Sequence, residues 1–263
     1  ETPPEPSTIN NHYIIQYDDD LAHKDAHSAL GRHSVRYSTR HEYDIFNGLA
    51  LHVQSDHDGH ALASIPGIKS VWPVTTYRLP NDANSSRAYH TQEHVQQLLR
   101  KRGILDPNQQ RSYHTATGVD ILQNQHNLTG KGIKVGIIDT GIDFKHPAFA
   151  WPGSGATAGC LGGINCRVQA GFDFVGDYFN GSSTRNIFPD FDPTDCQGHG
   201  THLAGIIGGN AMNMAGGPKP PQPFIGVAPE VTFGAYKIFG CSGETISDLI
   251  LAALELAAKD KMD

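Results

Sequence analysis

An apolar run that ends in a carboxylate is the feature that most constrains the fold of this chain. Residues 134–138 read Lys-Val-Gly-Ile-Ile, and Asp139 follows them directly. A continuous apolar run of this length is typical of a strand buried on both faces of a parallel sheet. Residues 231–239 form a second such run, and between the two lies His199, which leads into a segment of small apolar residues. This alternation predicts an α/β fold, a parallel sheet with helices on both faces.

The last part of the chain predicts a long helix over residues 244–259. Apolar residues recur there at helical spacing, at Ile246, Leu249, Ile250, Ala253, Leu256 and Ala257. We expect the apolar stripe of this helix to pack on the sheet.

Residues 12–80 have a different character and predict a small α+β domain. Its elements are expected at residues 13–17 (strand), 25–32 (helix), 43–53 (two strands), 61–65 (helix) and 71–77 (strand). The two middle strands are joined at Asn47-Gly48, a strong hairpin signal, and Pro73 marks the last strand as a sheet edge. The order strand, helix, strand, strand, helix, strand is the ferredoxin-like pattern.

Composition sets the remaining boundaries. Residues 1–11 are expected to be a polar leader without a visible signal peptide. Residues 81–116, rich in Asn, Ser, Gln and His, are expected to be a linker with at most one helix, over residues 91–102. Residues 117–263 then carry the parallel-sheet pattern.

Two motifs in this last region resemble those of the subtilisin-like serine proteases, or subtilases (peptidase family S8). They read Val135-Gly136-Ile137-Ile138-Asp139-Thr140-Gly141 and Gly198-His199-Gly200-Thr201-His202-Leu203-Ala204-Gly205. Asp precedes His, as in the Asp, His, Ser order of the family's triad. The resemblance implies an endopeptidase in which Asp139 orients the imidazole of His199, and His199 acts as general base and then general acid. It also implies that residues 117–263 are the N-terminal half of a subtilase catalytic domain.

Other functions for these motifs are weaker. An Asp at a strand end also serves as a turn cap, which is the alternative for Asp139 taken alone. Aspartic proteases use Asp-Thr-Gly, but they need two such carboxylates, and here the triplet occurs once and is followed by Ile142. No Gly-x-Gly-x-x-Gly follows the first strand, which disfavours a dinucleotide site.

The N-terminal domain itself resembles a subtilase propeptide. The segment Ile65-Pro66-Gly67-Ile68-Lys69-Ser70-Val71-Trp72-Pro73-Val74 carries the resemblance. It implies an inhibitor-type propeptide that assists folding of the protease and then occupies its active site. The alternative is an unrelated small α+β domain.

Residues 237–243 resemble the edge along which subtilases bind an extended substrate as an added strand. The resemblance makes Gly240, Ser242 and Gly243 candidate substrate-binding residues. The alternative is a strand-to-helix turn capped by Ser242 or Thr245.

The nucleophile that a subtilase needs is not found. Residues 1–263 hold no Gly-Thr-Ser segment, so the resemblance implies a chain truncated before the catalytic Ser. We therefore expect this polypeptide alone to lack peptidase activity, since loss of the nucleophile costs about a millionfold in turnover. Two accounts stay open: a cropped piece of a full protease, or a catalytically incompetent product that acts as a propeptide-type inhibitor or folding helper.

Cysteines and sequons favour a secreted, extracellular protein. The four cysteines, Cys160, Cys166, Cys196 and Cys241, allow three pairings into two disulfides; four free thiols are the alternative. Asn-x-Ser/Thr triplets give candidate glycosylation sites at Asn84, Asn127 and Asn180.

Charge and hydropathy exclude several partners. The net charge of −7 and the lack of a Lys/Arg-rich run argue against nucleic acid as a partner, and no apolar run is long enough to span a membrane.

We expect protein or peptide substrates, the chain's own propeptide as an intramolecular inhibitor, and a monomer. No cofactor is required. The resemblance makes calcium a possible structural ion, with oxygen ligands offered by Asp173, Asp177, Asp190, Asp192 and Asp195, but no spacing defines a metal site.

Histidine is concentrated at the N-terminus. Eight of the 15 histidines fall within residues 1–60: His12, His23, His27, His33, His41, His52, His57 and His60. Because imidazoles titrate near pH 6.5, we hypothesise that acidification weakens the hold of the propeptide. Compositional drift in a solvated domain is the alternative.

Overall fold

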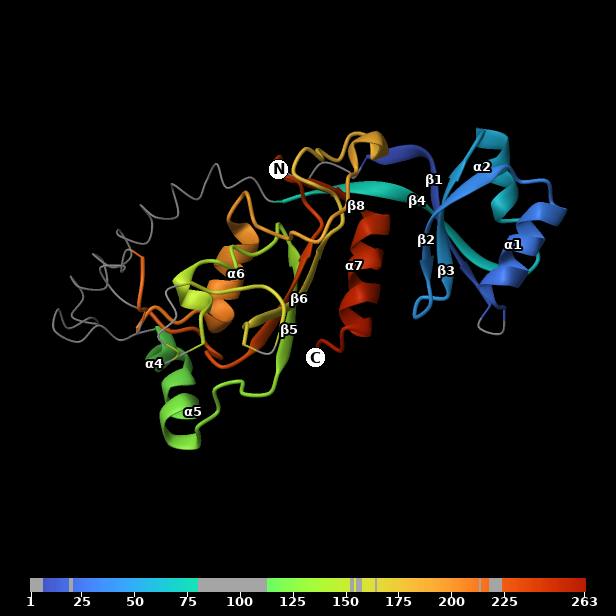
Figure 1. Ribbon diagram of the computed structural model, residues 1–263. Helices are drawn as coiled ribbons and strands as arrows, with labels where there is room; N and C mark the ends of the chain where they lie inside the picture. The colour runs from blue at the N-terminus through green and yellow to red at the C-terminus, as the bar shows by residue number, and fades with distance from the viewer. Residues whose placement is uncertain are drawn as a thin grey trace, which may run out of the picture.

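The computed structural model describes residues 7–18, 21–79, 113–151, 154, 158–163, 165–212, 214–217 and 224–263. They form a small N-terminal unit, residues 8–78, and a larger α/β unit, residues 113–263 (Figure 1). Residues 1–6 of the expected leader, nearly all of the expected linker with its helix, and Asn84 lie outside the described residues.

The N-terminal unit is a four-stranded antiparallel sheet with two helices. Its elements are β1 (Thr8–Tyr17), α1 (His23–Arg32), β2 (Tyr37–Tyr43), β3 (Gly48–Val53), α2 (Asp56–Leu62) and β4 (Ile68–Arg78). The strand order is β2-β3-β1-β4. One face of the sheet packs on α1 and α2, and Ile15, Leu30, Leu49, Leu51 and Leu62 are fully buried there. The unit therefore has a hydrophobic core of its own.

Several boundaries in this unit differ from those expected. β1 begins at Thr8, within the segment expected to be leader. The first hairpin strand ends at Tyr43 rather than beginning there, and residues 44–47 form the turn, in which Asn47 takes a left-handed φ of 53°. β2 is a polar strand at the edge of the sheet, so its sequence lacks the apolar alternation that indicates a strand. α2 begins earlier than expected because Ser55 caps it by accepting a hydrogen bond from Asp58 N.

The α/β unit is built on a three-stranded parallel sheet. Its strands are β5 (Lys134–Asp139), β6 (Val168–Asp173) and β7 (Thr232–Lys237), in the order β5-β7-β6. Short helices α4 (Tyr113–Thr117) and α5 (Val119–His126) precede the sheet, and 3-10 turns lie at Pro147–Phe149 and Thr184–Asn186. The longer helices are α6 (His199–Gly208) and α7 (Ser247–Lys259).

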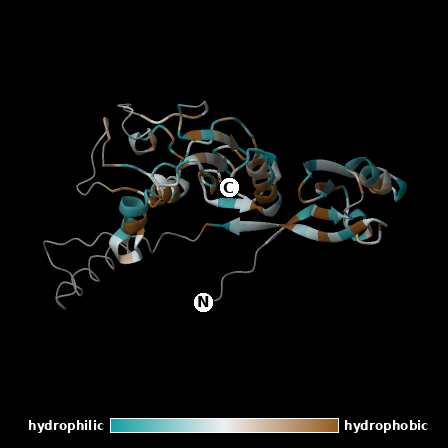
Figure 2. Ribbon diagram, turned by 90° about the horizontal axis from the view of Figure 1, so that it is seen from below, coloured by the Kyte–Doolittle hydropathy of each residue, from teal (hydrophilic) through white to brown (hydrophobic). Residues whose placement is uncertain are grey.

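These two longer helices cover opposite faces of the parallel sheet. Successive residues of a strand point to opposite faces, so Ile137 packs with Ala204 of α6, whereas Ile138 packs with the cluster that includes Leu249 and Ala253 of α7. Figure 2 shows hydrophobic residues gathered on the strands and helices at the centre of this unit. The α/β class and the helices on both faces are as expected from the sequence.

The expected helix over residues 244–259 is wrong at its start. Residues Glu244–Ile246 form a short strand, β8, and the helix begins only at Ser247. β8 pairs antiparallel with the end of β4, with Thr76 opposite Ile246 and Arg78 opposite Glu244. β4 pairs with β1 along its earlier part, so one strand joins the small antiparallel sheet to the α/β unit.

Helix α7 packs against both units. Ile14, Tyr43 and Val74, on the sheet face opposite α1 and α2, share one buried cluster with Leu249 and Ala253 of α7. Figure 1 shows α7 between the two sheets. The N-terminal sheet is thus covered on one face by its own helices and on the other by α7.

Candidate active site

Asp139 and His199 meet at the carboxyl end of the parallel sheet. Asp139 is the last residue of β5, and His199 is the first residue of α6. His199 Nδ1 lies 2.7 Å from Asp139 Oδ1. The Asp139 side chain is 10% exposed and that of His199 is 34% exposed, so a shielded carboxylate holds an imidazole whose ring is open to the surface.

Two glycines allow this close approach. Gly198, which caps α6, has a φ of 100°, a left-handed conformation that side chains with a Cβ rarely adopt. A Cβ on Gly200 would collide with the carbonyl oxygen of Gly141. Because Gly200 has none, its amide donates a 2.8 Å hydrogen bond to Thr140 Oγ1. This hydrogen bond joins the motif around Asp139 to the motif around His199.

Asp195 holds the start of α6. Its carboxylate accepts hydrogen bonds from the amides of Gln197 and Gly198, both at 2.8 Å, and from the amide and hydroxyl of Thr201 at 2.9 and 2.6 Å. Burial alone would raise the pKa of Asp195, but these hydrogen bonds lower it below its usual value. Thr201 Oγ1 in turn accepts from Asp143 N at 2.8 Å, which ties the His199 helix to the loop after Asp139.

The sequence offered Asp195 only as a possible calcium ligand, and its role in supporting α6 was missed. A short acidic side chain just before a glycine-initiated helix is a capping signal, and that signal could have identified it. The other acidic candidates also bond within the protein. Asp190 and Asp192 accept from amides two residues further on, so a calcium ion stays a prediction without a defined site.

Lys237 forms ion pairs with the remaining two acidic candidates. Its Nζ lies 3.1 Å from Asp173 Oδ2 and also contacts Asp177, and its side chain is 1% exposed. Burial lowers the pKa of Lys237, but hydrogen bonds to the two carboxylates outweigh it and raise that pKa. Lys237 therefore stays charged and holds the loop after β6 against the end of β7.

The three candidate substrate-binding residues are placed differently. Gly243 O accepts a hydrogen bond from Leu79 N at 3.1 Å, so it contacts the segment that follows β4. Gly240 O accepts from Gln197 Nε2, and Ser242 Oγ donates to Phe179 O at 3.0 Å. Gly240 and Ser242 therefore hold their own loop, and Gly243 alone of the three contacts the extended segment that lies along this edge.

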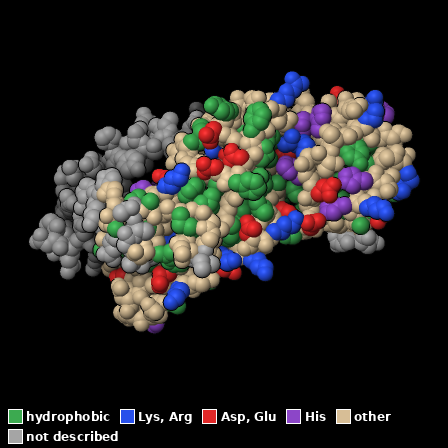
Figure 3. Space-filling view, viewed as in Figure 1, with side chains coloured by type: hydrophobic (Ala, Val, Ile, Leu, Met, Phe, Trp, Pro, Cys, Tyr) green, Lys and Arg blue, Asp and Glu red, His purple; other side chains and the backbone are tan. Residues whose placement is uncertain are grey.

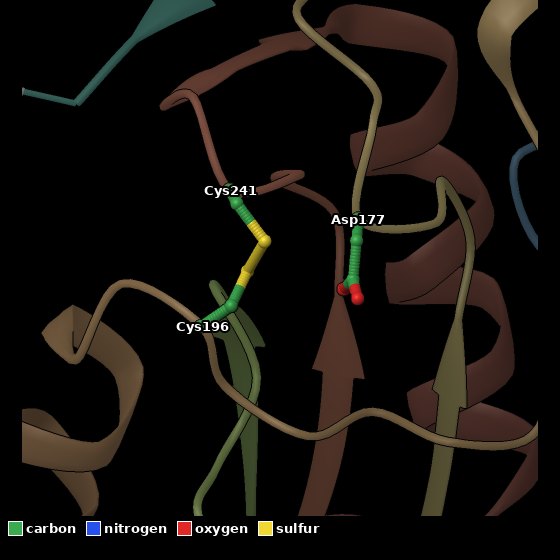
Figure 4. A group of neighbouring side chains, drawn as sticks. All are labelled: Asp177, Cys196 and Cys241. Carbon is green, nitrogen blue, oxygen red and sulfur yellow. A yellow bond between two sulfur atoms is a disulfide. The ribbon is translucent and has the colours of Figure 1, made fainter.

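The cysteines form two disulfides, Cys160–Cys166 and Cys196–Cys241. Figure 4 shows the second beside Asp177. Both sulfur atoms of that group are bonded to each other, so they offer no thiolate to a metal. Instead this disulfide links the loop before His199 to the loop after β7.

The two described sequon asparagines are exposed. Asn127 ends α5 in a left-handed conformation with a φ of 53°, and Asn180 Oδ1 accepts from Ser182 Oγ at 2.7 Å in an exposed turn. Among the helices of the described ranges, none is long and apolar enough to cross a membrane.

Comparison with known proteins shows the family of this chain. The family model for the subtilase family matches residues 130–263. The chain belongs to the subtilase family of serine proteases. The resemblance drawn from the Asp139 and His199 motifs is thereby confirmed.

Curated proteins that are similar to this chain are also proteases. The chain is 26% identical over 223 residues to the minor extracellular protease Vpr of Bacillus subtilis (strain 168), covering 84% of this chain and 23% of that protein. It is 30% identical over 132 residues to alkaline serine exoprotease A of Vibrio alginolyticus, covering 50% and 17%. It is 29% identical over 153 residues to a subtilisin of Bacillus sp. (strain TA39), covering 56% and 29%. The chain thus spans less than a third of each of these relatives.

A solved structure shows the same fold. The crystal structure of the S393A mutant of the epidermin leader peptide processing serine protease from Staphylococcus aureus matches with a TM-score of 0.55 at 17% identity. The match covers 95% of this chain and 48% of that one. At this identity the likeness supports the fold only.

Proposed function

We propose that the protein is a serine endopeptidase of the subtilisin type that hydrolyses protein substrates through an Asp139, His199, Ser triad. The observation that carries the proposal is the 2.7 Å contact between His199 Nδ1 and Asp139 Oδ1. Residues 1–263 supply the first two members, and no Gly-Thr-Ser segment among them supplies the third.

In this mechanism the geometry assigns each nitrogen of His199 a task. Nδ1–H donates to Asp139, which fixes the tautomer and stabilises the imidazolium. Nε2, on the open side of the ring, takes the proton of the serine hydroxyl as that oxygen attacks the peptide carbonyl. It then gives the proton to the leaving amine. Asp195 and Thr201 act only through the position of the helix that carries His199.

The N-terminal unit is, on this proposal, a ferredoxin-like propeptide over residues 12–80 that inhibits the protease. Its support is the pairing of the end of β4 with β8, which continues through Leu79 N to Gly243 O. Antiparallel addition of an extended segment to a sheet edge is a common mode of peptide recognition. On this proposal the segment occupies the edge along which an extended substrate would bind.

The remaining assignments follow from the same proposal. The protein would be secreted, which the two disulfides and the extracellular relatives support. Glycans at Asn127 and Asn180, a monomeric state, a structural calcium ion and catalysis without a cofactor are proposed with it. The linker and the N-terminal half of the catalytic domain would be residues 81–116 and 117–263.

Labelling of the active serine tests the proposal. The protein made from its full-length coding sequence should react with a fluorophosphonate probe and hydrolyse a labelled protein. Both signals should fall at least about ten-thousandfold in His199→Ala, and residues 1–263 expressed alone should give neither. A full-length secreted product, verified by intact mass, on which the probe finds no serine would instead favour the non-catalytic inhibitor or folding helper.

A further inference from the structure

We propose that Glu244 forms a charged subsite that selects a basic side chain in the protein substrate, directly N-terminal to an apolar anchor residue. The inference rests on the proposed endopeptidase function and names the substrate class that the edge of β8 prefers. It starts from the segment that pairs with this edge in the structure, Thr76 to Leu79.

The register of this segment is defined by backbone pairing. Thr76 lies opposite Ile246, Tyr77 opposite Thr245 and Arg78 opposite Glu244. Leu79 N donates to Gly243 O at 3.1 Å. A polypeptide that adds to β8 in the same register places one of its side chains beside Glu244.

Neighbouring side chains of a strand point to opposite faces, and the last two residues of the segment have different environments. Leu79 is partly buried against the apolar cluster that includes Ile246 and Leu249. Arg78, one residue earlier, lies at the surface, and its Nε contacts Glu244 Oε1 as an ion pair. The occupant thus carries a basic residue followed by an apolar anchor.

Glu244 is held in place to make this contact. Its side chain is only 20% exposed, whereas that of Arg78 is 73% exposed. On its other side lies Gly181, where even a Cβ would collide with Glu244 Cβ. With the segment in place the Glu244 carboxylate is largely covered, and a carboxylate that loses hydration favours an occupant that brings a positive charge.

Competition by short peptides measures this preference. The probe is a peptide that copies residues 74–84, tested as a competitor of labelled-protein hydrolysis by the processed protease made from its full-length coding sequence. Matched peptides carry Gln or Glu at the position of Arg78. We expect the Arg peptide to bind about two- to fivefold more tightly than the Gln peptide, as for a partly exposed ion pair, and the Glu peptide to bind most weakly. The ratio should shrink in 1 M salt.

The enzyme variants then assign the preference to one residue. In Glu244→Gln the Arg and Gln peptides should inhibit equally, and in Glu244→Lys the order of the Arg and Glu peptides should reverse. Asp120→Asn, in the first turn of α5, changes the net charge by the same amount as Glu244→Gln but lies away from β8. It should keep the wild-type ratio of Arg-peptide to Gln-peptide affinity. Equal inhibition by the Arg and Gln peptides in the wild-type enzyme, or a ratio unchanged in Glu244→Gln, would overturn the inference alone. A wild-type protein that hydrolyses no labelled protein would overturn the endopeptidase function and the inference with it.

Discussion

The disulfide between Cys196 and Cys241 joins the loop that leads into the His199 helix to the loop that follows β7. It closes a loop of 45 residues in sequence separation, whereas Cys160–Cys166 closes one of 6. Crosslinks that close longer loops remove more chain entropy from the unfolded state.

The first prediction follows from this difference. Replacing both Cys196 and Cys241 by Ser should lower the free energy of unfolding by about 2 kcal/mol more than replacing both Cys160 and Cys166. Urea unfolding of the two double variants, compared with wild type, measures it. Equal losses in the two variants would contradict the prediction.

A second prediction concerns Asp195. Asp195→Ala removes all four hydrogen bonds at the start of α6, and hydrogen bonds to a charged group contribute about 1.5–3 kcal/mol each. We expect kcat of the full-length protease to fall at least about tenfold with KM little changed, because His199 is misplaced while the substrate edge is intact. Asp192→Asn is the control, since that exposed carboxylate bonds only to nearby Thr194. An equal effect in the control would refute a specific role for Asp195.

Low pH should also weaken the hydrogen bonds that Asp195 accepts at the start of α6, and the direction of the effect follows from its pKa. The hydrogen bonds lower the pKa of Asp195 in the folded state, so its stabilisation is complete above the unfolded value of about 3.9. It is then lost as the pH falls through the lower folded value. Comparing the pH dependence of unfolding in wild type and Asp195→Ala isolates this contribution.

A third prediction concerns Glu255, the acceptor that α7 offers to the N-terminal unit. Its carboxylate, 8% exposed, accepts hydrogen bonds from the amides of Asp44 and Ile45 at 2.8 and 2.9 Å. In Glu255→Gln the N-terminal unit should bind the processed protease about tenfold or more weakly, because the charge-assisted acceptor is lost. Lys259→Gln removes an ion pair to the exposed Asp44 and a 3.5 Å pair with Glu255. It leaves the Glu255 carboxylate in place as the acceptor for the two amides, so it should change affinity by about fivefold at most. Co-elution of the unit at graded dilution compares the two.

A fourth prediction concerns pH. Histidines gather over the N-terminal unit (Figure 3). Two of them, His12 and His41, are close enough to α7 to interact with its Asp248. His12 Nε2 lies 3.4 Å from Thr184 Oγ1 and its ring lies 4.5 Å from that of His52. Burial lowers the pKa of both His12 and His41; Arg40 lowers them further, and the buried carboxylate of Asp248 opposes the shift.

The sign of the pH effect follows from these lowered pKa values. Above about pH 6.5 the imidazoles are neutral whether the unit is docked or free. As the pH falls below 6.5 the free unit takes up protons before the docked one, so docking weakens until the pH passes the lowered values. The fraction of the unit that co-elutes with the processed protease should therefore drop between pH 7 and 5. The drop should be smaller in the double variant His12→Gln, His41→Gln, and unchanged in His33→Gln, His57→Gln, whose imidazoles are exposed.

Local patterns explain which parts of this fold could be predicted. β5 and α6 each have a continuous signal, and the carboxyl end of a parallel strand is where polar side chains of an open α/β sheet collect. That rule places Asp139 at this end of the sheet, and the resemblance to subtilases implied that His199 lies beside it. The structure has the two side chains in contact. Their roles in catalysis stay predictions.

Long-range pairing explains the rest. β8 has only three residues, and its partner in β4 lies far upstream in the sequence, so no local period marks it. Its residues also fit the helical spacing of α7, which extended the expected helix too far. Likewise the pairing of Cys196 with Cys241 depends on how two distant loops of the α/β unit meet. The burial of Glu255 against the turn at Asp44 and Ile45 depends on how the two units meet.

Strand β4 is shared, because its earlier residues pair with β1 and its last residues pair with β8. On the proposed propeptide role, cutting the chain beyond Leu79 would leave both ladders in place, so cleavage alone would not release the unit. Since one strand carries both ladders, local unfolding of the core around Leu49 and Leu62 would also loosen the residues that pair with β8. The folding of the small domain therefore contributes to how long the edge of β8 stays covered.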